Sequence, residues 1–564
     1  MTLRVLRAPR GQDLVLGLVL TAVMIGPLFG GQGFWLFGDM VFVPSQPWKS
    51  TWLGLDGQLA RAVPMDALVS LLTQVVPGSW VQRCFLGGAL LAGSVGAGRL
   101  SSEVLGQTAW YARAAGLTVF VWNPWVHERL LMGQWAILAG YLLLPWVAVA
   151  ALRFRRDLRD GLPWLAVALV LSAVCSPSSG LMAVLTAVVL GVRRRRGHVA
   201  VLAALAVVAN LPWVVPSLLA DTDTVTVDGV FGTFAPRAES AAGVWASLFS
   251  LGGTWKSAIV PDERTSVVVV LLSCLVTLAA LAGARAAYLR APGAGIERLV
   301  ALAAVSFVLA AVPVVPGGAS LLESLGERVP GVAVLRDTQR YLAPAALLLV
   351  PGIAAAVTWV RGRVRPGREA VWGVVGLLVV APVLLLPSLA WGGFGTLQRS
   401  SYPEEWEQVA TLLEEAGPGR SIVLPWRGSY RGFDWNDRRA VLDPAPRFFP
   451  GEVLVDDRTF VDDAVVPSED PRVREVTTAL AGPDPAAALR AAGVRWVIVE
   501  KGMPAGAVPA GASVHDGPGL SVVDLGEPSR LPADPRVPVG VLLANAAMIL
   551  LLIGVFADIL RRRM

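Results

Sequence analysis

The sequence predicts a polytopic α-helical membrane protein that carries a small extracytoplasmic α/β domain. Of its 564 residues, 54% are hydrophobic and only 16% are charged, whereas soluble proteins carry about 25% charged residues. The mean hydropathy is +0.60. All but three of the 48 basic residues are arginines. They gather in short loops between apolar runs, which is typical of membrane topology rather than of nucleic-acid binding.

Twelve apolar runs approach the length of about 20 residues that a bilayer span requires. They are 14–34, 81–98, 107–122, 135–152, 162–175, 179–192, 199–219, 266–284, 299–316, 343–360, 370–390 and 538–560. The third, fifth and sixth are short, and the pair around 176–180 could form a re-entrant hairpin. The N-terminal run resembles a signal peptide, but because so many spans follow we expect a retained first helix.

The arginine clusters predict the topology. Twelve spans with both termini in the cytoplasm place every cluster on the cytoplasmic side, as the positive-inside rule requires. The clusters are Arg4/Arg7/Arg10, Arg99, Arg153/Arg155/Arg156/Arg159, Arg193 to Arg196, Arg285/Arg290/Arg298, Arg361/Arg363/Arg365/Arg368 and Arg561 to Arg563. The predicted domains are therefore a transmembrane domain with eleven spans (1–390), an extracytoplasmic domain (391–537), and a C-terminal helix with a cytoplasmic arginine tail (538–564).

The outward segments contain predicted elements of their own. In 391–537, a helix near 403–416 and a strand at 421–424 precede a helix at 485–492 and a strand at 494–500. Alternating helix and strand indicates an α/β domain. In the first outward segment, the amphipathic run from Met65 to Val76 is expected to lie along the membrane surface.

Several absences narrow the function. The interiors of spans five to eleven contain no Asp, Glu, Lys, Arg or His, although ion-coupled transporters place such residues near the bilayer midplane. The pattern favours an enzyme working at the membrane surface over a carrier. The 3 cysteines all lie in apolar runs, which predicts no disulfide framework for the α/β domain. No Walker loop, nucleophile elbow or dinucleotide fingerprint occurs.

Asp39 is the first candidate for chemistry. It follows the first span directly and lies between Phe37 and Phe42. A carboxylate that is partly desolvated at a membrane boundary has a raised pKa, which suits a general base. The alternative is a helix-end carboxylate solvated at the interface. Lys49 and Asp56 lie further along the same loop and are predicted to support the site.

The densest polar stretch runs from Trp122 to Trp135 and contains His127, Glu128, Arg129 and Gln134. His127, one of 3 histidines in the chain, and Glu128 are the candidate metal ligands. Arg129 can bind a phosphate through two parallel hydrogen bonds. The alternative is an interfacial helix that is anchored by its tryptophans and whose charges pair locally.

A second basic motif, Arg336-Asp337-Thr338-Gln339-Arg340-Tyr341, precedes the tenth span. On a helix, Arg336 and Arg340 would present adjacent guanidinium groups to a phosphate. Alternatively, they bind lipid phosphates without specificity, or Arg336 pairs with Asp337. Arg83, at the outer end of the second span, allows the same functional and lipid-binding interpretations. Six aspartates of the α/β domain are interpreted as a solvated surface: Asp434, Asp437, Asp456, Asp457, Asp462 and Asp463.

A family resemblance lies in three segments: Phe37-Gly38-Asp39-Met40 with Pro44, Val76-Pro77-Gly78-Ser79-Trp80-Val81-Gln82-Arg83, and Arg336 to Tyr341. These segments resemble the GT-C superfamily of polyprenyl-phosphate-dependent glycosyltransferases, and within it the mycobacterial-type α-(1→3)-arabinofuranosyltransferase (AftD) family. Asn123-Pro124-Trp125 and Glu128-Arg129 fit the same region. The resemblance covers the membrane part. Residues 391–537 stand where such enzymes carry an extended β-rich carbohydrate-binding region.

The resemblance implies a function. Asp39 would be the catalytic base, and Arg129, Arg336 and Arg340, with Arg83 as a further candidate, would contact the donor phosphate. A sugar of the arabinofuranose or mannose class would pass with inversion from a polyprenyl-phosphate donor to a glycan or glycolipid acceptor of the cell envelope. Transfer would occur on the extracytoplasmic side of the plasma membrane, with or without a divalent cation such as Mg²⁺ or Mn²⁺. Two alternatives stay open: a non-catalytic lipid-binding or scaffold protein of envelope assembly, and a transporter or flippase.

Overall fold

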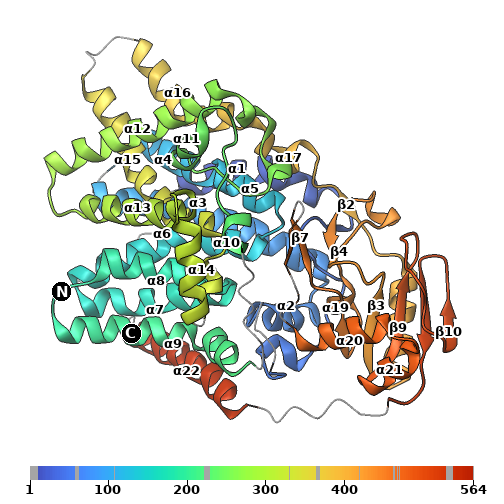
Figure 1. The fold of residues 1–564 in the computed structure, drawn as a ribbon. Helices are drawn as coiled ribbons and strands as arrows, with labels where there is room; N and C mark the ends of the chain where they lie inside the picture. Colours follow the sequence, from blue (N-terminus) through green and yellow to red (C-terminus); the bar gives the residue numbers. More distant parts are fainter. Residues whose placement is uncertain are drawn as a thin grey trace.

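The computed structural model describes residues 11–57, 62–106, 108–220, 229–329, 331–363, 369–417, 419–461, 464–466, 468, 470–528 and 538–562. Within these residues a helical part is followed by a mixed α/β domain and one last long helix (Figure 1). Several positions named above lie outside the described residues: Arg4, Arg7, Arg10, Arg365, Arg368, Arg563, Asp462 and Asp463.

All twelve predicted apolar runs coincide with helices. The long ones are α1 (Gly11–Phe29), α3 (Gly78–Leu105), α6 (Trp135–Arg156), α7 (Leu158–Cys175), α9 (Arg196–Leu219), α12 (Val267–Arg290), α13 (Ile296–Ala311), α15 (Ala346–Arg363) and α22 (Val539–Arg561). The shorter ones are α4 (Trp110–Val121), α8 (Pro177–Gly191) and α16 (Glu369–Leu385). Among the described residues, 9 helical segments are long and apolar enough to cross a membrane. The total of twelve, the re-entrant hairpin and the sidedness stay predictions.

Small residues let these helices approach closely, as is common where membrane helices pack. A Cβ atom at Gly93 of α3 would lie 2.5 Å from Cδ2 of Leu142 in α6. A Cβ at Gly283 of α12 would lie 2.0 Å from the carbonyl oxygen of Gly352 in α15. Larger side chains at these glycines would push the helix pairs apart.

Short elements fill the connections between the long helices. They are β1 (Phe34–Trp35), η1 (Ser50–Leu53), α2 (Met65–Thr73), α5 (Pro124–Leu131), α10 (Val230–Thr233), α11 (Gly243–Phe249), η2 (Ser257–Ile259), η3 (Asp262–Thr265), η4 (Val312–Val314), α14 (Gly318–Arg328), η5 (Val332–Leu335), η6 (Thr338–Ala345), η7 (Pro387–Leu389) and α17 (Trp391–Phe394). The predicted amphipathic run is helix α2, and its apolar side chains Leu68, Leu71 and Leu72 are exposed. Its place along the membrane surface stays a prediction.

The α/β domain contains a five-stranded mixed sheet in the order β10-β11-β9-β3-β6. Its strands are β3 (Arg420–Leu424), β6 (Glu452–Leu454), β9 (Val494–Glu500), β10 (Ala512–Asp516) and β11 (Leu520–Asp524); the small strands are β2 (Arg399–Ser400), β4 (Tyr430–Arg431), β5 (Val441–Leu442), β7 (Thr459–Val461) and β8 (Ala464–Val466). The helices are α18 (Glu404–Glu415), η8 (Asp434–Asn436), α19 (Ala445–Phe448), α20 (Pro471–Ala481) and α21 (Pro485–Ala491).

Side-chain alternation gives this sheet two apolar faces. Ile422 packs on the side of α20 and α21, whereas the next residue, Val423, packs on the side of α18. The predicted elements α18, β3, α21 and β9 are confirmed, and β3 pairs in parallel with β9. The antiparallel hairpin of β10 and β11 was not predicted, because strand β10 is mostly exposed and lacks an apolar pattern.

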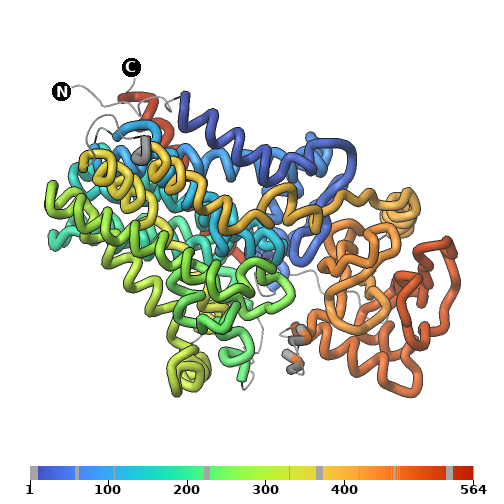
Figure 2. Tube along the Cα trace, turned by 90° about the horizontal axis from the view of Figure 1, so that it is seen from above, coloured from blue at the N-terminus to red at the C-terminus, as the bar shows by residue number. Residues whose placement is uncertain are grey.

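The first outward segment joins the helical part to the α/β domain. Residues 30–77, in blue, lie between the helices and the domain, which is orange to red (Figure 2). Strand β1 pairs antiparallel with β2, and further on Gly38 forms a parallel bridge with Val441. One continuous hydrophobic cluster runs through both parts, from Met24 in α1 to Trp406 in α18. The two parts are therefore joined by continuous apolar packing.

Candidate functional site

Two glycine turns hold Asp39 at this junction. Gly38 and Gly133 adopt φ values of +56° and +77°. A Cβ at Gly38 would lie 2.3 Å from the carbonyl oxygen of Met132, and one at Gly133 would lie 2.3 Å from that of Phe37. Both turns therefore need glycine, for the backbone angle and for the close approach. The backbone N–H of Asp39 donates to the carbonyl of Met132 at 3.0 Å, which fixes the start of its side chain.

The two carboxylate oxygens of Asp39 face different partners. Tyr430, in β4 of the α/β domain, donates its phenol hydroxyl to Oδ1. Gln134, one of the predicted site residues, lies 3.4 Å from Oδ2 through its side-chain nitrogen. Burial raises the pKa of Tyr430 above its usual range, and the negative charge of Asp39 raises it further. The phenol is therefore a hydrogen-bond donor at neutral pH.

Three cations act on Tyr430. The Lys256 ammonium lies 5.9 Å from the centroid of the Tyr430 ring, and the positive charges of Arg336 and Arg340 also act on Tyr430. Arg336 packs over the ring of Phe234 at 5.3 Å. A carboxylate with several cations nearby provides a base and an anion-binding environment in the same place.

The predicted motif from Arg336 to Tyr341 does not form one helix. Arg336 follows η5 and Arg340 lies in η6, with Asp337 between the two 3₁₀ helices. The expected i, i+4 presentation is therefore wrong. Asp337 pairs with Arg340 at 2.9 Å and with Arg129 at 2.9 Å. Although burial opposes it, the two guanidinium groups lower the pKa of Asp337, so it stays ionised.

Arg129 lies inside a buried polar network. Its guanidinium donates to Gln134 at 2.8 Å, to Asp337 and to Gln339. Its side chain is 0% exposed, and its contacts neutralise it internally. Gln134 therefore links this network to Asp39. Arg129 acts on the candidate base through an intermediate side chain rather than presenting itself at a surface.

Two buried glutamates continue the network. Glu128 accepts a hydrogen bond from Gln339 at 2.7 Å. Burial raises the pKa of Glu128 well above its ordinary value, and the adjacent carboxylate of Glu239 raises it further. Arg264 donates to Glu239 at 2.9 Å. Glu239 and Arg264 were not predicted, because they come from the outward segment 220–265, more than 100 positions from Glu128.

His127 faces away from Glu128. Its Nε2 lies 3.2 Å from the hydroxyl of Ser388, which donates to Glu263. Burial and the positive charge of Arg264 lower the pKa of His127 to about 3, so it is neutral at physiological pH. Within the residues that the structure describes, no group of three or more His, Cys, Asp or Glu side chains is placed to hold a metal ion. His127 and Glu128 face different partners, and the divalent cation considered above stays a prediction.

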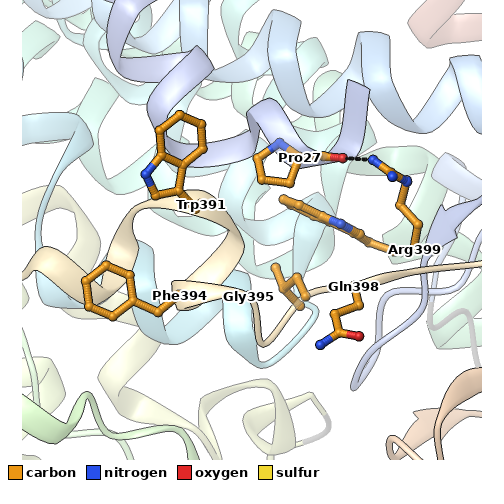
Figure 3. Close-up of a pocket in the computed structure, with 8 residues that line it drawn as sticks. Pro27, Trp391, Phe394, Gly395, Gln398 and Arg399 are labelled. Atoms are coloured by element: carbon orange, nitrogen blue, oxygen red, sulfur yellow. Dashed lines mark hydrogen bonds between the residues drawn. The ribbon is translucent and has the colours of Figure 1, made fainter. Parts of the chain in front are cut away.

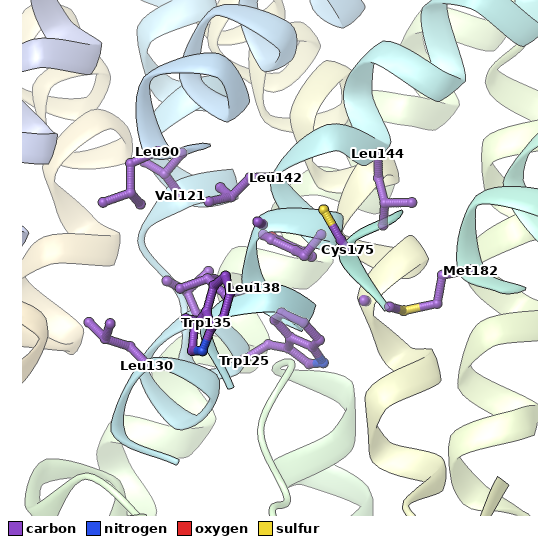
Figure 4. Close-up of a cluster of buried hydrophobic side chains, with 14 of the residues drawn as sticks. Leu90, Val121, Trp125, Leu130, Trp135, Leu138, Leu142, Leu144, Cys175 and Met182 are labelled. Atoms are coloured by element: carbon purple, nitrogen blue, oxygen red, sulfur yellow. The ribbon is translucent and has the colours of Figure 1, made fainter. Parts of the chain in front are cut away.

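The tryptophans of the Trp122–Trp135 stretch lie in the protein core, with Trp125 and Trp135 among apolar side chains of neighbouring helices (Figure 4). Trp125 stacks on Tyr141 with ring centroids 4.6 Å apart. The Asn123 side chain caps α5 by accepting from the N–H of Val126 at 3.1 Å. The alternative of an interfacial helix anchored by its tryptophans is therefore wrong, because these rings are buried.

Three predicted residues lie apart from Asp39. Arg83 donates to the carbonyl of Leu28 at 3.0 Å and to two glycine carbonyls beyond α1, so it caps that helix. Lys49 donates to the carbonyl of Pro446 at 2.6 Å. Asp56 lies 3.9 Å from Arg472. Lys49 and Asp56 therefore brace the α/β domain against the first loop.

An open cavity of about 550 Å³ lies near the outer end of α1 (Figure 3). Its walls are mostly apolar and aromatic, and its lining residues are Pro27, Trp35, Trp391, Phe394, Gly395, Leu397, Gln398 and Arg399. None of them is a predicted site residue. Arg399 donates to the carbonyl of Pro27, so the charged group in this cavity also caps α1.

Sequence reasoning missed Tyr430 and Lys256. Tyr430 is one of 6 tyrosines and lies 391 positions from Asp39. Lys256 is one of three lysines in a chain whose other basic residues are all arginines. The small number of lysines is the only feature of the sequence that could have drawn attention to Lys256. Nothing in the local sequence of Tyr430 distinguishes it.

Solved structures of other proteins share the fold of this chain. No family model and no curated protein matches the chain. A solved structure of the arabinofuranosyltransferase AftD from Mycobacteria superposes with a TM-score of 0.59 at 16% identity, covering 92% of this chain and 40% of that one. A mutant of that enzyme superposes with a TM-score of 0.56 at 17% identity, covering 92% and 41%.

The chain thus spans about 40% of the length of the structures it matches. The part of this chain left uncovered is smaller than residues 391–537, so the match extends into the α/β domain and is wider than the membrane part predicted from the motifs. The predicted resemblance is confirmed: this chain shares its fold with the arabinofuranosyltransferase AftD from Mycobacteria.

Proposed function

We propose that this protein is a membrane glycosyltransferase that transfers a sugar from a polyprenyl-phosphate donor to a cell-envelope glycan on the extracytoplasmic side. The observation that carries the proposal is the contact of Asp39 with Tyr430 at the junction of the two parts, with Lys256 over the ring of that tyrosine and the charges of Arg336 and Arg340 acting on it. The shared fold with AftD supports a GT-C enzyme. The arabinofuranose and mannose classes of donor follow from the motif resemblance.

The geometry suits a single displacement. Asp39 accepts the proton of an acceptor hydroxyl while that oxygen forms a bond to the anomeric carbon of the donor sugar. The bond from the anomeric carbon to the phosphate oxygen breaks on the opposite face, so the configuration inverts. The polyprenyl phosphate leaves with the bonding electron pair, and Lys256, Arg336 and Arg340 stabilise its negative charge.

The neighbouring residues keep Asp39 oriented for this reaction. Gln134 lies between Arg129 and Asp39. Its side-chain oxygen accepts from Arg129 at 2.8 Å, and its side-chain nitrogen approaches Oδ2 of Asp39 at 3.4 Å. Oδ1 is left to face Tyr430 and the cations. Because no three metal-ligating side chains converge among the described residues, the proposed reaction has no step that passes through a metal.

Transfer by the purified protein tests the proposal. The full chain in lipid nanodiscs is given radiolabelled polyprenyl-phosphoarabinose or polyprenyl-phosphomannose with oligosaccharide acceptors, and lipids that copurify are identified by mass spectrometry. We expect transfer by the wild type and its loss in Asp39→Asn. The matched control is Asp434→Asn, because Asp434 is an exposed aspartate paired with Arg438 on the α/β domain. Equal transfer by wild type and Asp39→Asn would refute the role of Asp39; no transfer from either donor would favour a scaffold.

A further inference from the structure

We propose that the Tyr430 hydroxyl occupies the position of the acceptor hydroxyl on Asp39, and that an incoming glycan replaces it, with the β4–β5 hairpin forming the acceptor side of the site. This inference rests on the proposed function and deepens it. It assigns the α/β domain a direct part in glycan binding, and it assigns Tyr430 a competing role.

The first support is the division of the Asp39 carboxylate. A general base must receive an O–H group within hydrogen-bonding distance. Oδ2 is approached by the amide nitrogen of Gln134, which can only donate. Oδ1 receives an O–H group, and it comes from Tyr430. The phenol therefore makes the contact that an acceptor hydroxyl would make before transfer.

The second support is that Tyr430 is not itself suited to react. A phenol attacks as its anion, and both burial and the charge of Asp39 oppose ionisation by raising the Tyr430 pKa. The phenol stays protonated and donates. It therefore donates to Oδ1 of Asp39 in the resting protein, and an incoming hydroxyl competes with it for that oxygen.

The third support is that the hairpin backbone is fixed while the ring is accessible. The N–H of Gly38 donates to Ala440 at 2.9 Å, and the N–H of Leu442 donates to Gly38 at 2.8 Å. Arg431, the neighbour of Tyr430 in β4, points to the other side and pairs with Glu500 at 2.7 Å and Asp443 at 3.1 Å, all three buried. Tyr430 itself is 42% exposed. We expect the hydroxyl to be replaced by rotation of the Tyr430 side chain while the hairpin backbone stays paired.

The ligand class follows from the groups that meet there. A carboxylate that accepts an O–H and a partly exposed tyrosine beside it suit a polyhydroxylated sugar, which offers hydroxyls at its edge and C–H groups on its face. The acceptor would lie between the α/β domain and the first loop. The donor phosphate would lie on the side of Arg336 and Arg340, whose positive charges act on Tyr430.

The test compares two tyrosines of the same domain. Tyr430→Phe removes the hydroxyl from Asp39. Tyr402→Phe is the matched control, because the Tyr402 hydroxyl also bridges the domain to the first loop, donating to the carbonyl of Phe42 at 3.0 Å, yet does not contact Asp39. The measurements are the acceptor KM and kcat of the full-length protein with an oligo-arabinofuranoside and an oligomannoside, together with the Kd of each oligosaccharide from tryptophan fluorescence.

We expect Tyr430→Phe to lower the acceptor KM and Kd about threefold to tenfold, because a hydrogen bond to a charged group no longer competes. Tyr402→Phe should leave both constants unchanged. A KM and Kd that are unchanged or higher in Tyr430→Phe would overturn the proposal, as would a fall in kcat alone, which would make Tyr430 a positioning residue.

The binding measurement separates this inference from the proposed function. If the wild type transfers no sugar but Tyr430→Phe binds oligosaccharide more tightly, the proposed enzyme activity fails and the competition stands. If the wild type transfers sugar and the two variants have equal KM and Kd, the activity stands and the competition fails. Binding too weak to detect in both proteins counts against the competition.

Discussion

Two charged regions of this molecule differ in how their charges are used. At the junction between two parts of the chain, Asp39 accepts from the phenol of Tyr430, a residue that is 42% exposed, and the charges of Lys256, Arg336 and Arg340 lie near or act on that tyrosine. Around Arg129, the side chains of Arg129, Glu128 and Asp337 are almost fully buried, Arg129 pairs with Asp337, and Glu128 accepts from Gln339. The sequence makes the second region the denser one, yet its charged side chains are enclosed by protein, whereas the first region is partly exposed. Charge density therefore does not identify a binding site; access to the charges does.

The largest expected effect comes from removing the candidate base of the first region, Asp39. Asp39→Asn should lower the rate of sugar transfer by about 10²- to 10⁴-fold, the usual contribution of a general base. Because the amide retains the shape and the contact with Gln134, the melting temperature in detergent should stay close to that of the wild type. Initial rates and thermal unfolding of the same preparation measure both. If the melting temperature falls strongly along with the activity, Asp39 has a structural role instead.

The next largest effect is a loss of stability when one carboxylate of the buried network around Arg129 is removed. Asp337→Asn leaves Arg129 and Arg340 without their carboxylate partner, and loss of one partner of a buried ion pair costs about 3–5 kcal/mol. The low pKa of Asp337 gives the direction with pH: its stabilisation is present above the unfolded value of about 3.9 and is lost as pH falls. Denaturant unfolding at pH 7 should show a marked loss of stability in the mutant. Equal stability would mean that the network is not held by this pair.

A smaller effect tests the cations at the junction. Lys256→Ala should raise the KM for the lipid-phosphate donor by about threefold to tenfold at low salt, and the difference should shrink in about 0.5 M salt as the charge is screened. Lys501→Ala is the control, because that lysine pairs with Asp516 at 2.5 Å on the other side of the domain. Donor titrations at two salt concentrations provide the measurement. A change independent of salt would assign Lys256 a packing role.

The smallest expected effect is a change in the pH dependence of stability when Glu128 of the buried network is replaced. The pKa of Glu128 is raised, mainly by burial, so its contribution to stability is present below the unfolded pKa of about 4.3 and is lost as pH rises toward the folded value. Glu128→Gln removes this titration. The melting temperature of the mutant relative to wild type should therefore be higher at pH 8 than at pH 5. The opposite trend would show that Glu128 is ionised in the folded protein.

The helices were predictable because hydropathy acts locally. Runs such as 135–152 and 199–219 contain enough apolar residues to specify a helix without reference to the rest of the chain, and each became one. The α/β domain was predicted in part for the same reason: β3 and β9 are continuous apolar runs buried on both faces. The exposed hairpin of β10 and β11 has no such run and depends on its pairing with β9.

The candidate site was predictable only in its membrane half. Asp39, Gln134 and Arg340 lie near ends of apolar runs, where polar residues stand out against the background. Tyr430 and Lys256 lie in ordinary polar segments, and only the fold brings them to Asp39. Arg129 shows the converse, because it stands out in the sequence but is enclosed by partners from a distant loop.

The sequence by itself determined that the chain is an apolar helical protein with an α/β domain, because hydrophobic periodicity and charge placement are properties of short segments. It also indicated Asp39, because placing a carboxylate beside a membrane-spanning run costs free energy and such residues are usually functional. Only the tertiary structure decided which charges are accessible and which cancel, because contacts between residues hundreds of positions apart depend on how the loops and the domain pack. That packing puts the Tyr430 hydroxyl on Asp39 and encloses Arg129.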